Sequence, residues 1–357
     1  MDERSITDYE YELPPALIAQ EPATTRAAAR LLVLAESGAL EDRVFADLPA
    51  LLRAGDLLVL NETRVIAARL RTRRESGGAV EMLLLHPAAA MRYDPHALSW
   101  NVLLRPAKRV REGERLAVLD REGATIATAE VTAVHEDGAR DVRFVSDMPF
   151  EALLERAGRL PLPPYIHNDS DEAQARYQTV FARVPGSVAA PTAALHFTPG
   201  LLDALEARGV ETTKITLDVG VGTFRPMQSE RIDDHRMHAE QYALSQESVD
   251  RIESARAQGR RVVAVGTTVV RALEGNVAAN GSLRAGEFAT DLFITPGFAF
   301  RVVDAMITNF HLPRSTLLVL VSAFAGRERV LEAYRAAIER GYRFFSFGDA
   351  MLVSRRA

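Results

Sequence analysis

The 357-residue sequence contains no cysteine. This absence excludes thiol nucleophiles, Cys-x-x-Cys redox chemistry, cysteine-ligated zinc and iron–sulfur clusters. Lysine occurs only at Lys108 and Lys214, so nearly all positive charge is arginine and Schiff-base chemistry has few groups to use. Long apolar runs are also missing, because the most apolar stretch, Thr316 to Ala325, is about half as long as a membrane span. We expect no membrane partner.

The composition is that of a globular protein, with 47% hydrophobic and 25% charged residues. The formal net charge is −5, so a nucleic-acid partner would have to bind a local basic patch. The first ten residues, MDERSITDYE, are acidic and polar, unlike a secretory or transit segment. We therefore expect a soluble protein of the cytoplasm.

Three zones of the chain differ in pattern. The first runs from Met1 to about Leu52. From Ala54 to about Ser146, strand-like runs are separated by the turn signals ESGG, REGE, DREG and HEDG, which favours a small antiparallel barrel or sandwich. From Pro149 to Ala357, helical and strand patterns alternate. This alternation predicts a mostly parallel α/β sheet, with ligands at the carboxyl ends of its strands.

A paired-glycine turn follows a predicted strand in DVGVGTF, which contains Asp218, Gly220, Gly222 and Thr223. Such a turn lets a ligand approach the backbone closely. It resembles the first motif of S-adenosylmethionine methyltransferases, except that Phe224 stands where a third glycine is typical. The alternative is a plain turn at the end of a strand.

A second turn, Gly266-Thr267-Thr268, joins the buried strand RVVAV to a predicted helix that contains Arg271. Free N–H groups and the helix dipole at such a point suit a carboxylate or a phosphate. The alternative is that threonine only caps the helix.

Four residues are candidates for proton transfer. His238 and Glu240 lie in DDHRMHAEQY, which favours an acid/base or substrate-contact cluster over a polar loop; its spacing matches no standard metal motif, and we expect no metal. His196 and His311 each stand between apolar residues, where a buried structural histidine is the usual outcome. His311, however, shares an irregular turn with other polar residues, which is typical of a site.

Two segments in the second zone are rich in positive charge. They contain Arg64 and Arg69 in one, and Arg105 and Lys108 in the other. They form either a solvated strand face or a stripe that follows RNA phosphates.

Together these segments resemble one family over about Tyr11 to Val353, the S-adenosylmethionine:tRNA ribosyltransferase-isomerases of queuosine biosynthesis. The strings that carry the resemblance include YELPPALIAQEP, GDLLVLNETRVIAARL, RYQTVFARVPGSVAAPTAALHFTP, VGVGTFRPM, DHRMHAEQY, VVAVGTTVVRALE and ITNFHLPRSTLLVLVSAFAG. The sequence departs from the family pattern at Asp218, where histidine is common, and at Glu62, Ala67 and Thr295.

The resemblance implies an α/β catalytic domain of residues 1–53 and 149–357 that carries a β-barrel domain of residues 54–148. It implies transfer and isomerisation of the ribosyl group of S-adenosylmethionine onto aminomethyl-deazaguanine at the tRNA wobble position, giving epoxyqueuosine, adenine and methionine. S-adenosylmethionine would be a co-substrate, with no prosthetic group. The tRNA would carry a G-U-N anticodon, and we expect a monomer.

We assign roles on this basis. The catalytic candidates are His238, Glu240, His311 and His196. The candidates for binding S-adenosylmethionine are Asp218, Gly220, Gly222, Thr223, Gly266, Thr267, Thr268 and Arg271. The candidates for binding tRNA are Arg64, Arg69, Arg105 and Lys108.

Two other functions remain open from the residues alone. The LDVGVG string is compatible with an S-adenosylmethionine-dependent methyltransferase, which would release S-adenosylhomocysteine. The arginine-rich segments are compatible with a non-catalytic tRNA-binding protein, which would leave S-adenosylmethionine intact.

Overall fold

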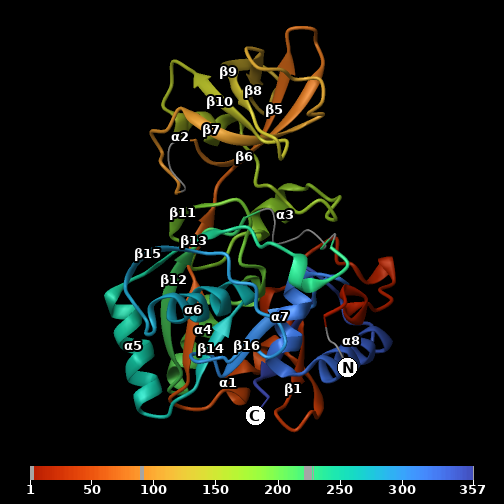
Figure 1. The fold of residues 1–357 in the computed structure, drawn as a ribbon, viewed down its shortest axis with the longest axis vertical. Helices are drawn as coiled ribbons and strands as arrows, with labels where there is room; N and C mark the ends of the chain where they lie inside the picture. The colour runs from red at the N-terminus through yellow and green to blue at the C-terminus, as the bar shows by residue number, and fades with distance from the viewer. Residues whose placement is uncertain (1–3, 89–91, 221–226, 228, 357) are drawn as a thin grey trace. The chain divides into compact units, whose positions relative to one another are not determined.

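The computed structural model describes residues 4–88, 92–220, 227 and 229–356. The chain forms two compact units, each with its own sheet (Figure 1). The α/β unit consists of Met1–Thr63, Pro163–Ala182 and Ala190–Ala357, and the barrel unit of Arg64–Leu162 and Arg183–Ala189. The expected fold class, α/β with an added antiparallel β-barrel, is confirmed.

A nine-stranded sheet forms the centre of the α/β unit, in the order β15-β13-β12-β3-β14-β16-β17-β1-β2. Its four central strands, from β12 to β16, are parallel, while the outer strands add both parallel and antiparallel pairs. The strands are β1 (Arg30–Leu34), β2 (Leu40–Val44), β3 (Leu57–Asn61), β12 (Glu211–Leu217), β13 (Glu240–Leu244), β14 (Val262–Val265), β15 (Gly286–Thr290), β16 (Ala305–Asn309) and β17 (Ala350–Ser354).

Strand β3 corrects the predicted domain boundary. The sequence pattern predicts that residues 54–148 form the barrel, yet β3 pairs with β12 and β14 in the middle of the large sheet. All five residues of β3 are buried, as expected for a parallel strand that is covered on both faces. Its continuous apolar run therefore marks a central α/β strand, whereas barrel strands alternate between buried and exposed residues.

Helices cover both faces of the sheet. On one face, Leu58 and Leu60 of β3 pack in a core with Phe45, Phe197 and Leu205, which come from segments around α1 and α4. The intervening residues of β3 point to the opposite face, and β3 also contacts α6. The helices of this unit are α1 (Leu48–Leu51), α3 (Asp171–Arg176), α4 (Pro199–Ala207), α5 (Gln246–Ala257), α6 (Thr267–Asn280), α7 (Thr316–Ala325) and α8 (Arg327–Glu339).

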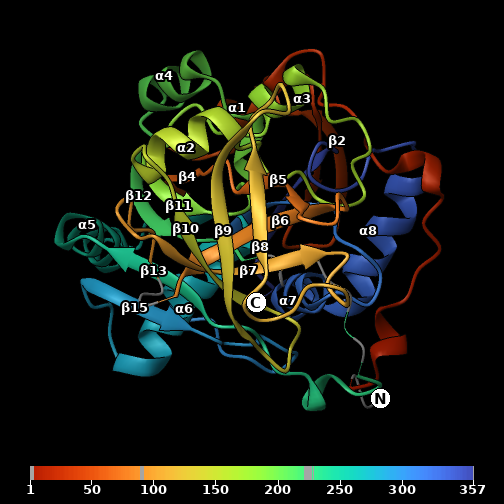
Figure 2. The ribbon, with the colours of Figure 1, turned by 90° about the horizontal axis from the view of Figure 1, so that it is seen from above.

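The barrel unit is a closed antiparallel barrel in the order β10-β7-β6-β5-β8-β9, seen from above in Figure 2. Trp100 of β7 stacks on Phe150, the first residue of α2, with ring centroids 5.2 Å apart. The segment after residue 148 thus belongs to the barrel unit. The helices and strands of the barrel unit are β4 (Thr63–Val65), β5 (Arg69–Arg74), β6 (Ala79–Pro87), β7 (Ser99–Arg105), β8 (Arg115–Leu119), β9 (Thr125–Val134), β10 (Arg140–Val145), α2 (Phe150–Ala157) and β11 (Val184–Ser187).

Among the residues that the structure describes, no helix is both long enough and apolar enough to cross a bilayer.

Candidate active site

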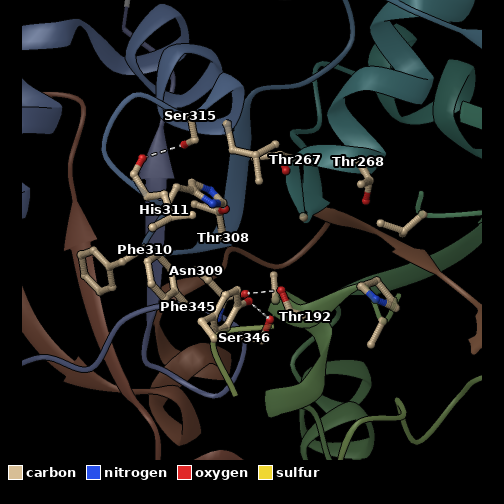
Figure 3. A pocket seen from close by; sticks show the side chains of 18 residues that line it. Thr192, Thr267, Thr268, Thr308, Asn309, Phe310, His311, Ser315, Phe345 and Ser346 are labelled. Atoms are coloured by element: carbon tan, nitrogen blue, oxygen red, sulfur yellow. Dashed lines mark hydrogen bonds between the residues drawn. The ribbon is translucent and has the colours of Figure 1, made fainter. Parts of the chain in front are cut away.

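A pocket lies at the carboxyl-terminal edge of the parallel strands, within the α/β unit. It contains about 630 Å³ of space between atoms, and Figure 3 shows the side chains that surround it. Gly266 follows β14 and Asn309 ends β16, so two neighbouring strands deliver residues to it. Ligands of α/β sheets bind at this edge.

The N-terminus of α6 forms one wall of the pocket through Gly266, Thr267 and Thr268. Gly266 is the N-cap residue and has a φ of 96°, a conformation that side-chain-bearing residues rarely adopt. Its backbone N–H donates to the carbonyl of Ile307 at 2.8 Å, which ties the turn to β16. The structure therefore places the three predicted residues together at the pocket.

The N-terminus of α7 forms a second wall. Ser315 lines the pocket and is the N-cap residue of α7, where its hydroxyl accepts a hydrogen bond from the Leu318 N–H at 3.2 Å. The first turn of any helix leaves N–H groups without intrahelical partners and carries partial positive charge. Because two such termini reach one pocket, its electrostatic potential favours an anionic ligand group.

A polar network lies around Asn309. The Thr192 hydroxyl donates to Asn309 Oδ1 at 2.8 Å, and Asn309 Nδ2 donates to the Asp349 carbonyl at 3.3 Å. Thr192 and Asn309 both line the pocket (Figure 3). The network therefore presents hydroxyl and amide groups in fixed orientations.

His311 lines the pocket and is held from several sides. Its Nε2 lies 2.7 Å from the Thr308 hydroxyl, and its backbone N–H donates to the Tyr334 hydroxyl at 3.0 Å. The Tyr11 hydroxyl donates to its carbonyl oxygen. Burial lowers the pKa of His311 to about 3, so the ring is neutral near pH 7. His311 can therefore offer hydrogen bonds in the pocket, but as a neutral ring it lacks the acidic second proton of an imidazolium and cannot act as a general acid at that pH.

His196 is not among the described residues that line the pocket. Its Nε2 lies 3.4 Å from Asn309 Nδ2, and its ring packs on Phe45 with centroids 5.0 Å apart. Burial, with a smaller contribution from nearby arginines such as Arg343, lowers the pKa of His196 to about 3. This geometry favours a supporting role behind Asn309.

Glu240 and Arg271 form a buried ion pair, with 4% and 2% of their side chains exposed. Arg271 also donates to the carbonyls of Leu292, at 3.1 Å, and Thr290, at 3.4 Å. The second oxygen of Glu240 accepts a hydrogen bond from the Gly220 N–H at 3.4 Å. Both charged groups therefore have partners inside the protein, which favours positioning roles over contact with substrate.

The end of β12 is fixed by β3. Asn61 is fully buried, and its side chain bonds both the N–H and the carbonyl of Leu217, at 3.0 and 2.9 Å. Asp218 comes next and accepts a hydrogen bond from the Thr63 hydroxyl at 3.1 Å. Val219 then lines the pocket, which places Asp218 beside it.

The remaining candidates of this unit are less well placed. His238 is exposed and is not one of the described residues that line the pocket. Gly222 and Thr223 lie outside the described residues.

On the barrel unit, Arg64, Arg105 and Lys108 are exposed. Arg69 is different, because its guanidinium donates to the carbonyl of Leu162 at 2.7 Å and lies 3.9 Å from Glu81. Three of the four predicted tRNA-binding cations are therefore free of such structural contacts in the described part of the chain.

Several pocket residues were not among the predicted site residues. Thr192, Thr308 and Ser315 carry no motif of their own, although Ser315 shares the NFHLPRST turn that singled out His311. Tyr165 and Ser346, whose hydroxyl oxygens lie 2.5 Å apart at the pocket, come from distant segments that only the fold joins.

Within the described residues, no group of three or more histidine, aspartate or glutamate side chains is arranged to hold a metal ion.

Comparisons with known proteins agree on one family. The model of the family described as queuosine biosynthesis protein matches residues 6–353. A protein of Moorella thermoacetica is 53% identical over 98% of this chain and 99% of its own length, and one of Symbiobacterium thermophilum is 51% identical over the same shares. Both are named S-adenosylmethionine:tRNA ribosyltransferase-isomerase.

A solved structure is also similar. The S-adenosylmethionine tRNA ribosyltransferase of Thermotoga maritima is 38% identical, with a TM-score of 0.53 over 97% of this chain and 99% of the other. Since the family model and relatives above half identity both span nearly the whole sequence, this chain belongs to the queuosine biosynthesis family of S-adenosylmethionine:tRNA ribosyltransferase-isomerases.

Proposed function

We propose that this chain transfers and isomerises the ribosyl group of S-adenosylmethionine onto aminomethyl-deazaguanine at the wobble position of tRNA. The products are epoxyqueuosine in the tRNA, adenine and methionine. The observation that carries the proposal is the pocket at the strand ends, where the N-termini of α6 and α7 meet a set of hydroxyl and amide groups.

The helix termini suit the methionine part of the donor. Its carboxylate would accept hydrogen bonds from the N–H groups at the start of α6, beside Gly266. Arg271, which the sequence suggested for this role, already bonds Glu240 and two carbonyls, so the backbone is the better partner.

The sulfonium needs a negative neighbour, and the Asp218 carboxylate at the end of β12 is the candidate. The positive sulfur makes the adjacent ribose C–H acidic, so a well-placed base of ordinary strength can remove that proton. The amine of the deazaguanine is the nucleophile, which agrees with a sequence that has no cysteine.

Adenine leaves as a neutral base and must receive a proton. Because His311 is neutral, it would orient the donor by hydrogen bonding rather than protonate the adenine. His238 stays the candidate proton carrier, because its side chain is exposed and imidazole is the most common general acid or base in enzymes. Replacing His238 by glutamine should then lower turnover far more than tRNA affinity; normal turnover would reassign it as structural.

The RNA would bind partly through Arg64, Arg105 and Lys108 on the barrel unit, because the chain as a whole is acidic. We further propose that the substrates are tRNAs with a G-U-N anticodon, that the protein acts as a monomer in the cytoplasm, and that it requires no prosthetic group.

One reaction tests the proposal. The purified protein is incubated with S-adenosylmethionine labelled in its ribose and with tRNA that carries aminomethyl-deazaguanine, and the nucleosides and small molecules are then separated. Label in the modified nucleoside, with equal amounts of adenine and methionine, supports the function. S-adenosylhomocysteine as product would indicate a methyltransferase, and an intact donor would indicate a tRNA-binding protein; either result rejects it.

A further inference from the structure

A hollow lined by seven arginines lies in the α/β unit at the edge of the sheet opposite the pocket. Its positive residues are Arg53, Arg256, Arg260, Arg261, Arg301, Arg355 and Arg356. Arg261 directly precedes β14, while Gly266, which lines the pocket, directly follows it. Since β14 and β16 have four and five residues at about 3.3 Å each, the two sites are about 13–17 Å apart along the strands.

Four of these arginines have structural partners. Arg261 bonds both oxygens of Asp56, and Arg355 lies 3.2 Å from Asp304. Arg256 and Arg260 pair with Glu253 and Glu211, at 3.0 and 2.9 Å. These four ion pairs fix the walls of the hollow and neutralise their own charge.

The other three, Arg53, Arg301 and Arg356, are exposed. In the part of the chain that the structure describes, their guanidinium groups form no hydrogen bond or ion pair. Glu36 is the lining carboxylate that stands outside the four pairs. The hollow therefore keeps a local positive charge on a protein whose formal net charge is −5.

The dimensions favour a large anion. The hollow has a volume of about 1140 Å³, slightly above the roughly 300–1,000 Å³ of small-molecule sites. The three free guanidinium groups come from separate segments, so they suit several spaced charges rather than one. A guanidinium binds phosphate oxygens through two parallel hydrogen bonds.

We propose that the hollow binds the phosphate backbone of the substrate tRNA at a place outside the anticodon arm. This inference rests on the proposed function, which supplies the tRNA as partner. The wobble base enters a pocket at the opposite sheet edge, so we place the phosphates that reach the hollow outside the anticodon arm, and the isolated stem-loop tests that placement. It adds affinity without sequence preference, because the contacts are to phosphates.

The test compares two RNAs and two matched variants of the full chain. One variant is Arg301→Gln with Arg356→Gln. The control, Arg284→Gln with Arg335→Gln, removes the same charge from exposed arginines outside the hollow. Affinity for full-length tRNA and for an isolated anticodon stem-loop is measured by fluorescence anisotropy over a range of salt concentrations. Thermal melting checks that all variants fold.

Each phosphate contact contributes about 0.7–0.9 to the magnitude of the slope of log K against log salt concentration. With full-length tRNA, the slope of the Arg301→Gln, Arg356→Gln variant should therefore be smaller in magnitude by about 1.5 than that of the unmodified protein. Its slope with the stem-loop, and the slopes of the control, should equal those of the unmodified protein. Adding Arg53→Gln should lower the tRNA slope again. An unchanged tRNA slope, or an equal loss with the stem-loop or in the control, would overturn the proposal.

Ribosyl transfer to the stem-loop is measured on the same samples. The hollow variant should retain the rate of the unmodified protein, since the stem-loop does not reach the hollow, and a large loss of that rate would count against the proposal. If the unmodified protein transfers no ribosyl group, the proposed function fails, while the salt slopes still report on the hollow. The two failures are thus distinguishable.

Discussion

The carboxylate of Glu240, at the start of β13, forms an ion pair with the guanidinium of Arg271 in α6, and both side chains are almost completely buried. The other Glu240 oxygen accepts the Gly220 N–H, next to Val219 at the pocket. The pair thus links the pocket-forming helix α6 to the turn after β12. A substitution of either residue should therefore shift the backbone that forms the pocket.

The first prediction concerns this pair. Glu240→Gln should lower the free energy of unfolding by about 3–5 kcal/mol, because it leaves the Arg271 charge buried without its partner. The double variant Glu240→Gln with Arg271→Met should cost less than the two single changes added together. Urea denaturation measures both effects. If the changes are additive, the two side chains do not act as a pair.

The second prediction concerns acid stability. Burial depresses the folded-state pKa of His196 and of His311 from 6.5 to about 3. In the unfolded chain each ring takes up a proton below about pH 6.5, whereas in the folded chain it does so only below about pH 3. The contribution of the two neutral histidines to the free energy of unfolding is therefore fully present above pH 6.5. It decreases as the pH falls from 6.5 towards 3.

Each buried histidine should contribute about 1.4 kcal/mol per pH unit to that decrease. His311→Gln removes one titrating group, so its free energy of unfolding should change less steeply with pH by that amount. Urea titrations between pH 4 and pH 7 measure the slope. An identical slope in the variant would mean that His311 titrates normally in the folded protein.

The third prediction concerns the start of α6. Gly266→Ala forces a side chain into a φ of 96°, which should cost about 1–2 kcal/mol of stability and weaken binding of S-adenosylmethionine. Gly281→Ala is the matched control, since Gly281 caps the other end of α6 with a φ of 78° and has open space around it. It should cost similar stability and leave donor affinity unchanged. Calorimetric titration with S-adenosylmethionine compares the two variants. Equal affinities would show that the N-terminus of α6 does not contact the donor.

The fourth prediction concerns the cations of the barrel. Arg105→Ala with Lys108→Ala should weaken tRNA binding and reduce its salt dependence, while affinity for S-adenosylmethionine stays the same. Arg69→Ala serves as a contrast, because its guanidinium bonds the Leu162 carbonyl and its loss should mainly lower barrel stability. An unchanged salt slope in the double variant would identify Arg105 and Lys108 as ordinary solvated side chains.

The sequence predicts the architecture well where a local pattern reflects burial. The alternating runs of β6 and β7 indicate a barrel, and the GTT turn correctly marks the start of α6. The boundary of the barrel was misplaced because an apolar run such as Leu57–Asn61 suits either kind of strand until its neighbours are known.

The site is harder to predict because its contacts are distant in sequence. Thr192 and Asn309, whose side chains bond at the pocket, are 117 positions apart, and neither belongs to a motif that indicates the other. Arg271 shows the opposite difficulty. Its type and position suit a carboxylate ligand, but the fold supplies an internal carboxylate, Glu240, which no spacing rule reveals.

Strand β2, which forms one of the two edges of the large sheet, exposes a row of charged residues. Glu41, Asp42 and Arg43 follow one another there, and four of the five residues of β2 are exposed. A bare sheet edge invites strand addition by another chain, and charged side chains along it make such pairing unfavourable. The α/β unit thus carries its own protection against edge-to-edge aggregation, and replacing these residues with β-branched apolar ones would turn that edge into a site of self-association.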